Sequence, residues 1–310
     1  MESLNRMALE LVEEAIEFAD ELAIAITELD DGATVLDFGH DVAGGIEAGL
    51  LLAEIQTAGL ATIQNRLGEV AGAPVPHIDL TTDRPALALL CAQKAGWELD
   101  ADGFEGLASG PGRALLAEEE IFARVGHEDD FDFATLAIEA DELPGEAVAE
   151  RVADRTDVGA NAVFLPSFPS ASLVGSVTAA ARAAELATVR LADLGYDPLD
   201  IRSVSANAPV APVASDEATA IGLANDTLAY GGQVHLTVDE EFGRFDELPS
   251  TASDEYGVPF EEILDSVDWN FADLPDGLFA PAQVTVDVSG GPTHAFGETS
   301  EDVLGDAFGL

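Results

Sequence analysis

The chain has 310 residues, and its 47% apolar content is ample for the core of one large or two ordinary domains. Its 60 acidic residues outnumber 12 basic ones, which gives a formal net charge of −48. A surface of this sign repels phosphate backbones and anionic lipid headgroups, and no basic stripe with interleaved aromatic residues offsets it. Nucleic acids and membranes are therefore excluded as partners.

The acidic residues are scattered among periodic apolar residues, which argues against a disordered acidic tail. Repulsion among so many carboxylates destabilises a compact chain in dilute buffer. At molar salt the Debye length falls to about 3 Å, so the same surface becomes tolerable. The composition therefore indicates adaptation to high salt.

Apolar residues spaced three and four apart predict helices, and alternating or short apolar runs predict strands. The predicted helices are Leu4–Ile24, Pro85–Ala95, Arg113–Val125, Glu146–Arg155, Ser172–Leu194 and Asp216–Tyr230. The clearest predicted strands are Thr34–Phe38, Phe131–Ile138, Ala162–Leu165, Gln233–Val238 and Gln283–Val288. Their alternation predicts an α/β fold in two lobes, residues 1–160 and 161–310, with an approximate boundary at a Gly/Asn break. The N-terminal helix is compatible with either lobe.

The first helix carries acids within its apolar repeat and is followed by no small-residue cleavage site, so it is not typical of a signal peptide. The uncharged run from Val158 to Ala181 contains two prolines and is not a membrane-spanning helix. Cys91 is the single cysteine, which excludes an intramolecular disulfide. These features predict a cytoplasmic protein.

No motif points to a resident metal or nucleotide. The histidines are dispersed and no HExxH or CxxC spacing occurs, so no metal is expected. The sequence GPGRAL at 110–115 lacks the third glycine of a dinucleotide fingerprint. Its backbone N–H groups are either free to meet an acceptor-rich ligand at a helix start or used in a capped loop, and both readings stay open.

Arg182 and Glu185 interrupt the small apolar residues of 172–191. Apolar residues occupy the neighbouring helix faces, which indicates a buried helix with two charged side chains three residues apart. One interpretation is an exposed ion pair, and another is a buried pair that joins the lobes. The third is a general base beside a guanidinium, suited to hydrolysis of an electrophile that is already activated.

Several segments together resemble the archaeal and methylotroph methenyltetrahydromethanopterin cyclohydrolases. They occur in family order and span nearly the whole chain. They are GGIEAGLLLAEIQTAGLA (44–61), TTDRPALALLCAQKAGWEL (81–99), ASGPGRAL (108–115), FPSASLVGSVTAAARAAE (168–185), APVAPVA (208–214), AND with YGG (224–232) and FAPAQVTVDV (279–288).

This resemblance implies a homotrimeric enzyme of one-carbon metabolism that reversibly hydrolyses the 5,10-methenyl bridge of a tetrahydropterin carrier to the N5-formyl form, without a cofactor. It implies two-lobed α/β subunits with the pterin in a cleft between the lobes. Arg182 and Glu185 match the family's catalytic pair. The small-molecule pterin is then the partner, and Glu185 accepts a proton from water while Arg182 orients it.

The resemblance also implies substrate contacts from the matching segments. These are Lys94, Ser109, Gly110, Asp83, Asn225 and Tyr230. Lys94 is the only lysine, and it either contacts the pterin or its anionic tail or is a surface lysine. Departures from the family pattern at Arg84, Gly112 and Asn207 leave open whether the carrier is methanopterin or folate-like. The alternatives to an enzyme are a non-catalytic pterin-binding protein of the same fold and a structural oligomer.

Overall fold

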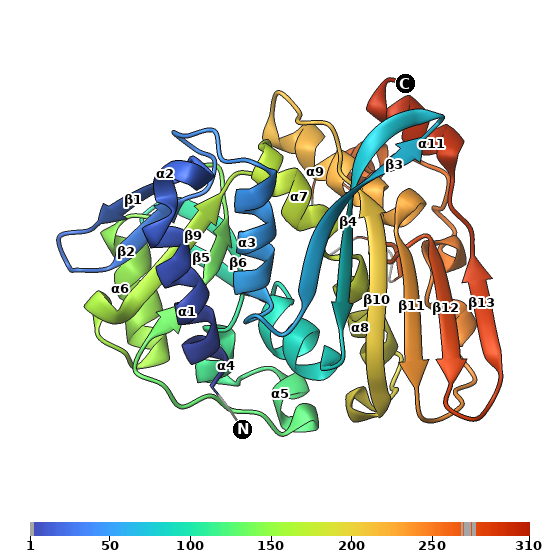
Figure 1. Ribbon diagram of the computed structural model, residues 1–310, viewed down its shortest axis with the longest axis horizontal. Coiled ribbons are helices and arrows are strands. Elements are labelled where there is room, and N and C mark those ends of the chain that lie inside the picture. The colour runs from blue at the N-terminus through green and yellow to red at the C-terminus, as the bar shows by residue number, and fades with distance from the viewer. Residues whose placement is uncertain (1–2, 268, 270–273, 275–276) are drawn as a thin grey trace. The chain divides into compact units, whose positions relative to one another are not determined.

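The computed structural model describes residues 3–267, 269, 274 and 277–310 (Figure 1). The chain forms two compact units, one of Met1–Thr62 with Ala86–Thr178 and the other of Ile63–Pro85 with Ala179–Leu310. Sequence analysis predicted one boundary near residue 160, whereas the chain changes unit after Thr62, Pro85 and Thr178. Strand pairing explains the difference, because residues 163–168 pair with a strand of the first unit and residues 73–82 with a strand of the second.

The first unit contains a seven-stranded mixed sheet in the order β1-β2-β9-β8-β6-β5, with β7 paired to β9. Strands β7, β8 and β2 run parallel to β9, and the other pairs are antiparallel. Its elements are α1 (Leu4–Glu17), α2 (Ala19–Leu22), β1 (Ala25–Glu28), β2 (Thr34–Asp37), α3 (Ile46–Gln56), the π-helix η1 (Ala86–Gln93), β5 (Trp97–Ala101), β6 (Phe104–Ser109), α4 (Arg113–Leu116), α5 (Glu120–Val125), β7 (Ala134–Thr135), β8 (Ala137–Glu139), α6 (Glu146–Thr156), η2 (Ala160–Ala162), β9 (Val163–Phe168) and most of α7 (Leu173–Ala180).

Helices cover both faces of this sheet. Successive residues of a strand point to opposite faces, so Leu36 joins the core that includes Leu52 of α3, whereas Val35 joins the core that includes Val152 of α6. The helix α1 belongs to the first of these cores and so to the first unit. The side chain of the fully buried Asn5 fixes it there, since its amide nitrogen donates to the carbonyl of Pro111 at 2.8 Å.

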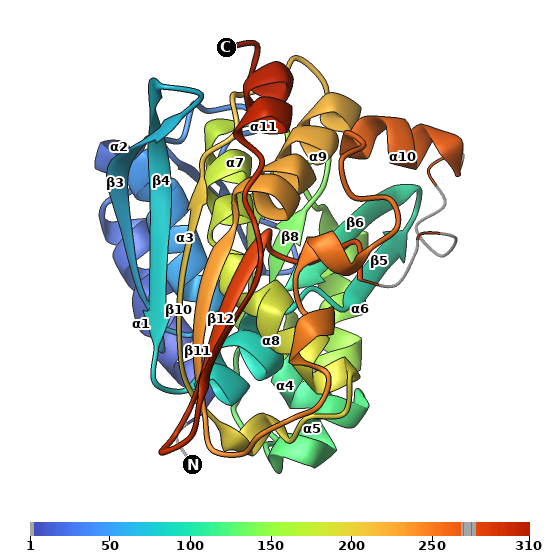
Figure 2. The ribbon, with the colours of Figure 1, turned by 90° about the vertical axis from the view of Figure 1, so that its right-hand side faces the viewer.

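The second unit contains a six-stranded sheet in the order β13-β12-β11-β10-β4-β3. Helix α8 packs on one face of it against β10 and β11, as Figure 2 shows. Helices α9, α10 and α11 share a further core that includes Tyr230, Phe260 and Leu304. The elements are β3 (Thr62–Val70), β4 (Ala73–Thr82), α8 (Ala183–Asp193), η3 (Pro198–Asp200), β10 (Ile201–Pro209), α9 (Glu217–Asp226), the π-helix η4 (Thr227–Gly231), β11 (Gln233–Val238), η5 (Phe245–Glu247), η6 (Ser250–Ala252), α10 (Phe260–Ser266), β12 (Gln283–Val288), β13 (Thr293–Gly297) and α11 (Glu301–Phe308).

The structure therefore confirms a mixed α/β protein, here with two sheets. Several helices predicted as continuous are divided. The first ends at Phe18 before α2, the third is broken at Ala117, which adopts a left-handed backbone with φ of 47°, and the last becomes a π-helix after Asp226. None of the helices in the described part of the chain is long and apolar enough to cross a membrane.

Candidate active site

The helix predicted over Ser172–Leu194 is interrupted at the charged pair. Helix α7 ends at Ala180 and α8 begins at Ala183, with Arg182 as the capping residue between them. The Arg182 amide donates to the carbonyl of Ala179 at 2.9 Å, a three-residue spacing typical of a tightened turn. The alanines of this segment favour an unbroken helix, so the turn comes from the surrounding structure rather than from local propensity.

The turn brings the two side chains together. Arg182 Nε donates to Glu185 Oε2 at 2.8 Å. The Glu185 side chain is 4% exposed and that of Arg182 is 19% exposed, so the pair is not the exposed ion pair that sequence analysis left open. Glu185 lies in the first turn of α8, where the helix dipole favours a carboxylate.

One face of the segment is fully buried. Val177, Ala181, Ala184, Thr188 and Leu191 are each at most 1% exposed. A carboxylate that is buried in such apolar surroundings is costly unless a cation is paired with it. Arg182 supplies that cation to Glu185.

Lys94, Ser109 and Gly110 lie in the first unit, close to one another. Lys94 follows η1, and its Nζ donates to Glu119 Oε2 at 2.6 Å. Gly110 N donates to Ala92 O at 2.9 Å, which joins the end of β6 to the end of η1. The Ser109 side chain is buried, and its hydroxyl accepts a hydrogen bond from Gln56 Nε2 at 3.1 Å.

The amides of the GPGRAL segment are used within the chain. Gly112 N donates to Thr135 O at 2.8 Å and Ala114 N to Pro111 O at 2.9 Å. The prediction of free amides for an acceptor-rich ligand is therefore wrong at these positions and at Gly110, and the capped-loop reading holds. The reason is that the segment crosses the edge of β7, whose carbonyl takes the Gly112 amide.

Asp83, Asn225 and Tyr230 belong to the second unit, with Arg182 and Glu185. Asp83 is exposed in the bend after β4. Asn225 Nδ2 donates to Ile221 O of its own helix at 2.8 Å.

Tyr230 is 1% exposed and belongs to the core around α9. Its hydroxyl donates to Val258 O and accepts from Gly257 N at 3.2 Å. Burial raises the pKa of this hydroxyl to about 12. Tyr230 was predicted to contact the substrate; in this structure its hydroxyl holds the segment before α10.

Sequence reasoning missed three titratable residues. Arg113 and Glu119 form an ion pair beside Lys94, and Asp226, next to the predicted Asn225, is a carboxyl group that is 2% exposed. The sequence points to Asp226 only indirectly, because this residue is the last of the AND triplet that resembles the family. Among the described residues, no group of three His, Cys, Asp or Glu side chains is arranged to hold a metal ion.

Comparison with known proteins assigns the family. The model of the family described as "Cyclohydrolase (MCH)" matches residues 3–308. A methenyltetrahydromethanopterin cyclohydrolase of Halobacterium salinarum is 57% identical over 310 residues, which cover 100% of both chains. Enzymes of the same name from Methanocella arvoryzae and Methanosphaerula palustris are 39% and 38% identical, and each match covers all of this chain and at least 99% of the relative. The chain therefore belongs to the cyclohydrolase (MCH) family and is a hydrolase that acts on C–N bonds.

Proposed function

We propose that the chain hydrolyses methenyltetrahydromethanopterin, or a closely related tetrahydropterin carrier, to the N5-formyl compound, and that the reaction is reversible. The full-length relatives that carry this name support the substrate. The observation that carries the mechanism is the buried hydrogen bond between Arg182 Nε and Glu185 Oε2.

In the proposed reaction Glu185 acts as general base. The methenyl carbon belongs to an amidinium cation, which the carboxylate attracts. Water adds to this carbon while its proton passes to Glu185, and a tetrahedral carbinolamine forms. Arg182 holds the carboxylate in place for the attack.

The carbinolamine then collapses. Its C–O bond becomes the formyl carbonyl, the bond from this carbon to N10 breaks, and the protonated Glu185 returns its proton to N10. The hydroxyl proton of the intermediate is released to solvent, so one cation and one water give the neutral formyl product and one proton. Both proton transfers thus use one carboxyl group.

Substrate contacts are proposed for Lys94, Ser109, Gly110, Asp83, Asn225 and Tyr230. The Gly110 amide is hydrogen-bonded within the chain. In the proposal Gly110 therefore does not donate to the substrate, and its contribution is to let the substrate approach the backbone closely. The cleft between lobes, the homotrimer, the cytoplasmic location and the absence of a cofactor stay predictions. Sedimentation in molar KCl tests the trimer.

The alternative of a non-catalytic pterin-binding protein is less well supported. Binding alone does not require a carboxylate held in an apolar setting by a guanidinium, because such a group costs folding free energy. The similarity to a cyclohydrolase over the full length of both chains also favours an enzyme.

The test compares the wild type with Glu185→Gln in molar KCl by the decay of the methenyl absorbance. We expect the variant to fold, to bind the pterin and to turn over about 10²- to 10⁴-fold more slowly, as when a general base is removed. Glu247→Gln is the matched control, since Glu247 forms an exposed ion pair with Arg244 at the same three-residue spacing. Equal rates in all three proteins would remove Glu185 from the mechanism, and no decay with either methanopterin or folate substrates would leave only the binding protein.

A further inference from the structure

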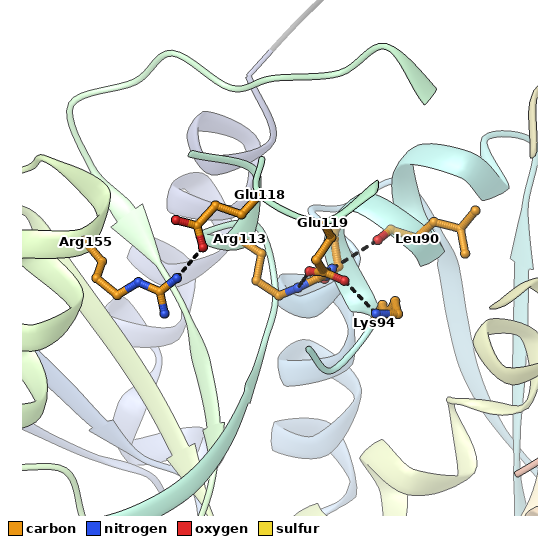
Figure 3. Close-up of polar contacts among 7 residues, drawn as sticks. Leu90, Lys94, Arg113, Glu118, Glu119 and Arg155 are labelled. Carbon is orange, nitrogen blue, oxygen red and sulfur yellow. Dashed lines mark hydrogen bonds and ion pairs between the residues drawn. The ribbon is translucent and has the colours of Figure 1, made fainter. Parts of the chain in front are cut away.

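The single lysine of the chain is anchored by a partly buried network of ion pairs. Figure 3 shows the Glu119 carboxylate between two cations, with Oε2 accepting from Lys94 Nζ at 2.6 Å and Oε1 accepting from Arg113 Nε at 2.9 Å. The guanidinium also donates to the carbonyls of Ala92 at 3.2 Å and Leu90 at 3.5 Å. Arg113 thus ties the loop that carries Glu119 to the end of η1.

Burial differs among the three charged groups. The Arg113 side chain is 2% exposed, whereas those of Lys94 and Glu119 are 25% and 29% exposed. Burial tends to raise the pKa of Glu119, but the Arg113 guanidinium and the hydrogen bonds from Lys94 and Arg113 outweigh it, so the pKa lies below its ordinary value. Glu119 is therefore charged at neutral pH, and the trio carries one net positive charge.

That charge is available only at the lysine. The Arg113 guanidinium is enclosed by Glu119 and the two carbonyls, whereas Lys94 Nζ uses one of its three N–H donors in the described contacts. In a chain of net charge −48, a fixed ammonium with donors to spare is a local attraction for an anion.

A glycine makes room for this arrangement. A Cβ on Gly96 would lie 3.0 and 3.1 Å from the two carboxylate oxygens of Glu119 and 3.2 Å from Arg113 Nε. These distances are shorter than ordinary van der Waals contact. A side chain at position 96 would therefore require the carboxylate or the guanidinium to shift.

We propose that Glu119, held by Arg113, is a positioning residue that fixes the Lys94 ammonium so that its remaining donors bind an anionic group of the C1 carrier. This inference rests on the proposed function, because it takes Lys94 to be a substrate contact. Glu119 itself does not touch the substrate.

If Glu119 only neutralises charge, and if instead it positions Lys94, the substitution Glu119→Gln should have opposite effects on substrate binding. The substitution raises the net charge of the trio, so if Glu119 only neutralised charge, the anionic group of the carrier would bind more tightly. If Glu119 positions Lys94, the KM of methenyltetrahydromethanopterin rises by about tenfold or more, the usual effect of losing a charged hydrogen bond, while kcat changes by less than about threefold.

Three further variants separate positioning from a merely structural effect. Lys94→Met should raise KM similarly, and Glu119→Gln added to it should cause no further rise, because a residue that acts through Lys94 is not additive with its loss. Gly96→Ala, which displaces the carboxylate without changing charge, should raise KM as well. Glu118→Gln is the control, since this neighbouring carboxylate pairs with Arg155 instead (Figure 3).

The same variants are also titrated with the substrate by equilibrium binding in the Glu185→Gln background, so that the inference is tested without turnover. An unchanged or lower Kd with Glu119→Gln, or an additive effect in the double variant, overturns the positioning role. If the wild type and Glu118→Gln turn over, the proposed function stands whatever Glu119 does. If they do not, the proposed function fails and the Kd values still decide the role of Glu119.

Discussion

The buried carboxyl of Asp226 should make the stability of the protein depend on pH. It ends α9, is 2% exposed, and its Oδ1 accepts a hydrogen bond from Phe260 N at the start of α10 at 2.8 Å. Burial raises the pKa of this group from 3.8 to about 6, with a further upward push from Glu261 and a downward one from the Phe260 amide. Tyr230, the other titratable group beside it, stays neutral since its pKa is about 12.

The sign follows from linkage. Because the folded-state pKa lies above the unfolded one, folding favours the protonated form, and stability that is fully present below the unfolded pKa is lost as the pH rises through about 6. The difference between 3.8 and about 6 corresponds to about 3 kcal/mol at neutral pH, and about 1.5 kcal/mol of this is already lost at about pH 5.

Asp226→Asn keeps an oxygen that accepts from Phe260 N and removes the charge. We expect the variant to be more stable than the wild type, by an amount that grows by about 1.5 kcal/mol between about pH 5 and pH 7.5. Urea unfolding followed by circular dichroism at fixed molar KCl measures this difference. Asp306→Asn, on an exposed position of α11, is the control for loss of one negative charge. A difference that does not vary with pH, or one that Asp306→Asn reproduces, would refute the reasoning.

Three other expectations concern the whole chain, one turn and the cysteine. Dialysis from molar KCl to dilute buffer should unfold the protein, because screening of its −48 charges is lost; a circular dichroism spectrum indifferent to salt contradicts this. Gly297→Ala should lower the free energy of unfolding by several kcal/mol, since φ is +74° and the new Cβ would lie 2.1 Å from Ala282 O. Gly290→Ala, at a similar φ of +73° but with open space around the new Cβ, should lower it by only about 1 kcal/mol. Equal losses of stability in the two variants would show that the contact with Ala282 O does not matter. Cys91 is fully buried and burial raises its thiol pKa to about 12, so iodoacetamide at about pH 8 should label it only after urea is added, and rapid labelling of the folded protein would argue against that burial.

Strands with strict alternation were predictable. Both Gln233–Val238 and Gln283–Val288 have the bounds that sequence analysis assigned them, because every second residue is a buried valine or leucine. The helix predicted from Glu146 differs by one residue at its end. In these segments one face is apolar and the other is solvated, and under this condition the spacing of apolar residues predicts whether a segment is a helix or a strand.

Elements buried on several sides were missed. Helix α3 reads IEAGLLLAEIQ and buries residues around most of its circumference, so no period of 3.6 stands out. Strand β10, IRSVSANAP, alternates small polar with small apolar residues, which is a weak strand signal. Breaks such as the one at Arg182 were also missed, since the alanines around it favour an unbroken helix.

The charged pair of the candidate site was predictable for a local reason. Arg182 and Glu185 lie three residues apart, so any helix-like backbone brings them together. The anchoring of Lys94 was not predictable, because Glu119 lies 25 residues away in the sequence and contacts Lys94 only in the folded chain. Local spacing thus predicted the pairing, and the family resemblance implied its catalytic role, whereas the residues that position a proposed substrate contact required three-dimensional structure.

The way the chain changes unit three times has a consequence for its biogenesis. Strand β4 is synthesised before residues 86–178, yet its partner β10 follows them, with Ile78 opposite Ala208. The hairpin of β3 and β4 must therefore remain without its sheet while the first unit is synthesised, and contacts so distant in sequence slow folding. A fragment that ends at residue 178 would carry this orphan hairpin, so expression of the units as separate pieces should succeed only if residues 63–85 are transplanted to the second.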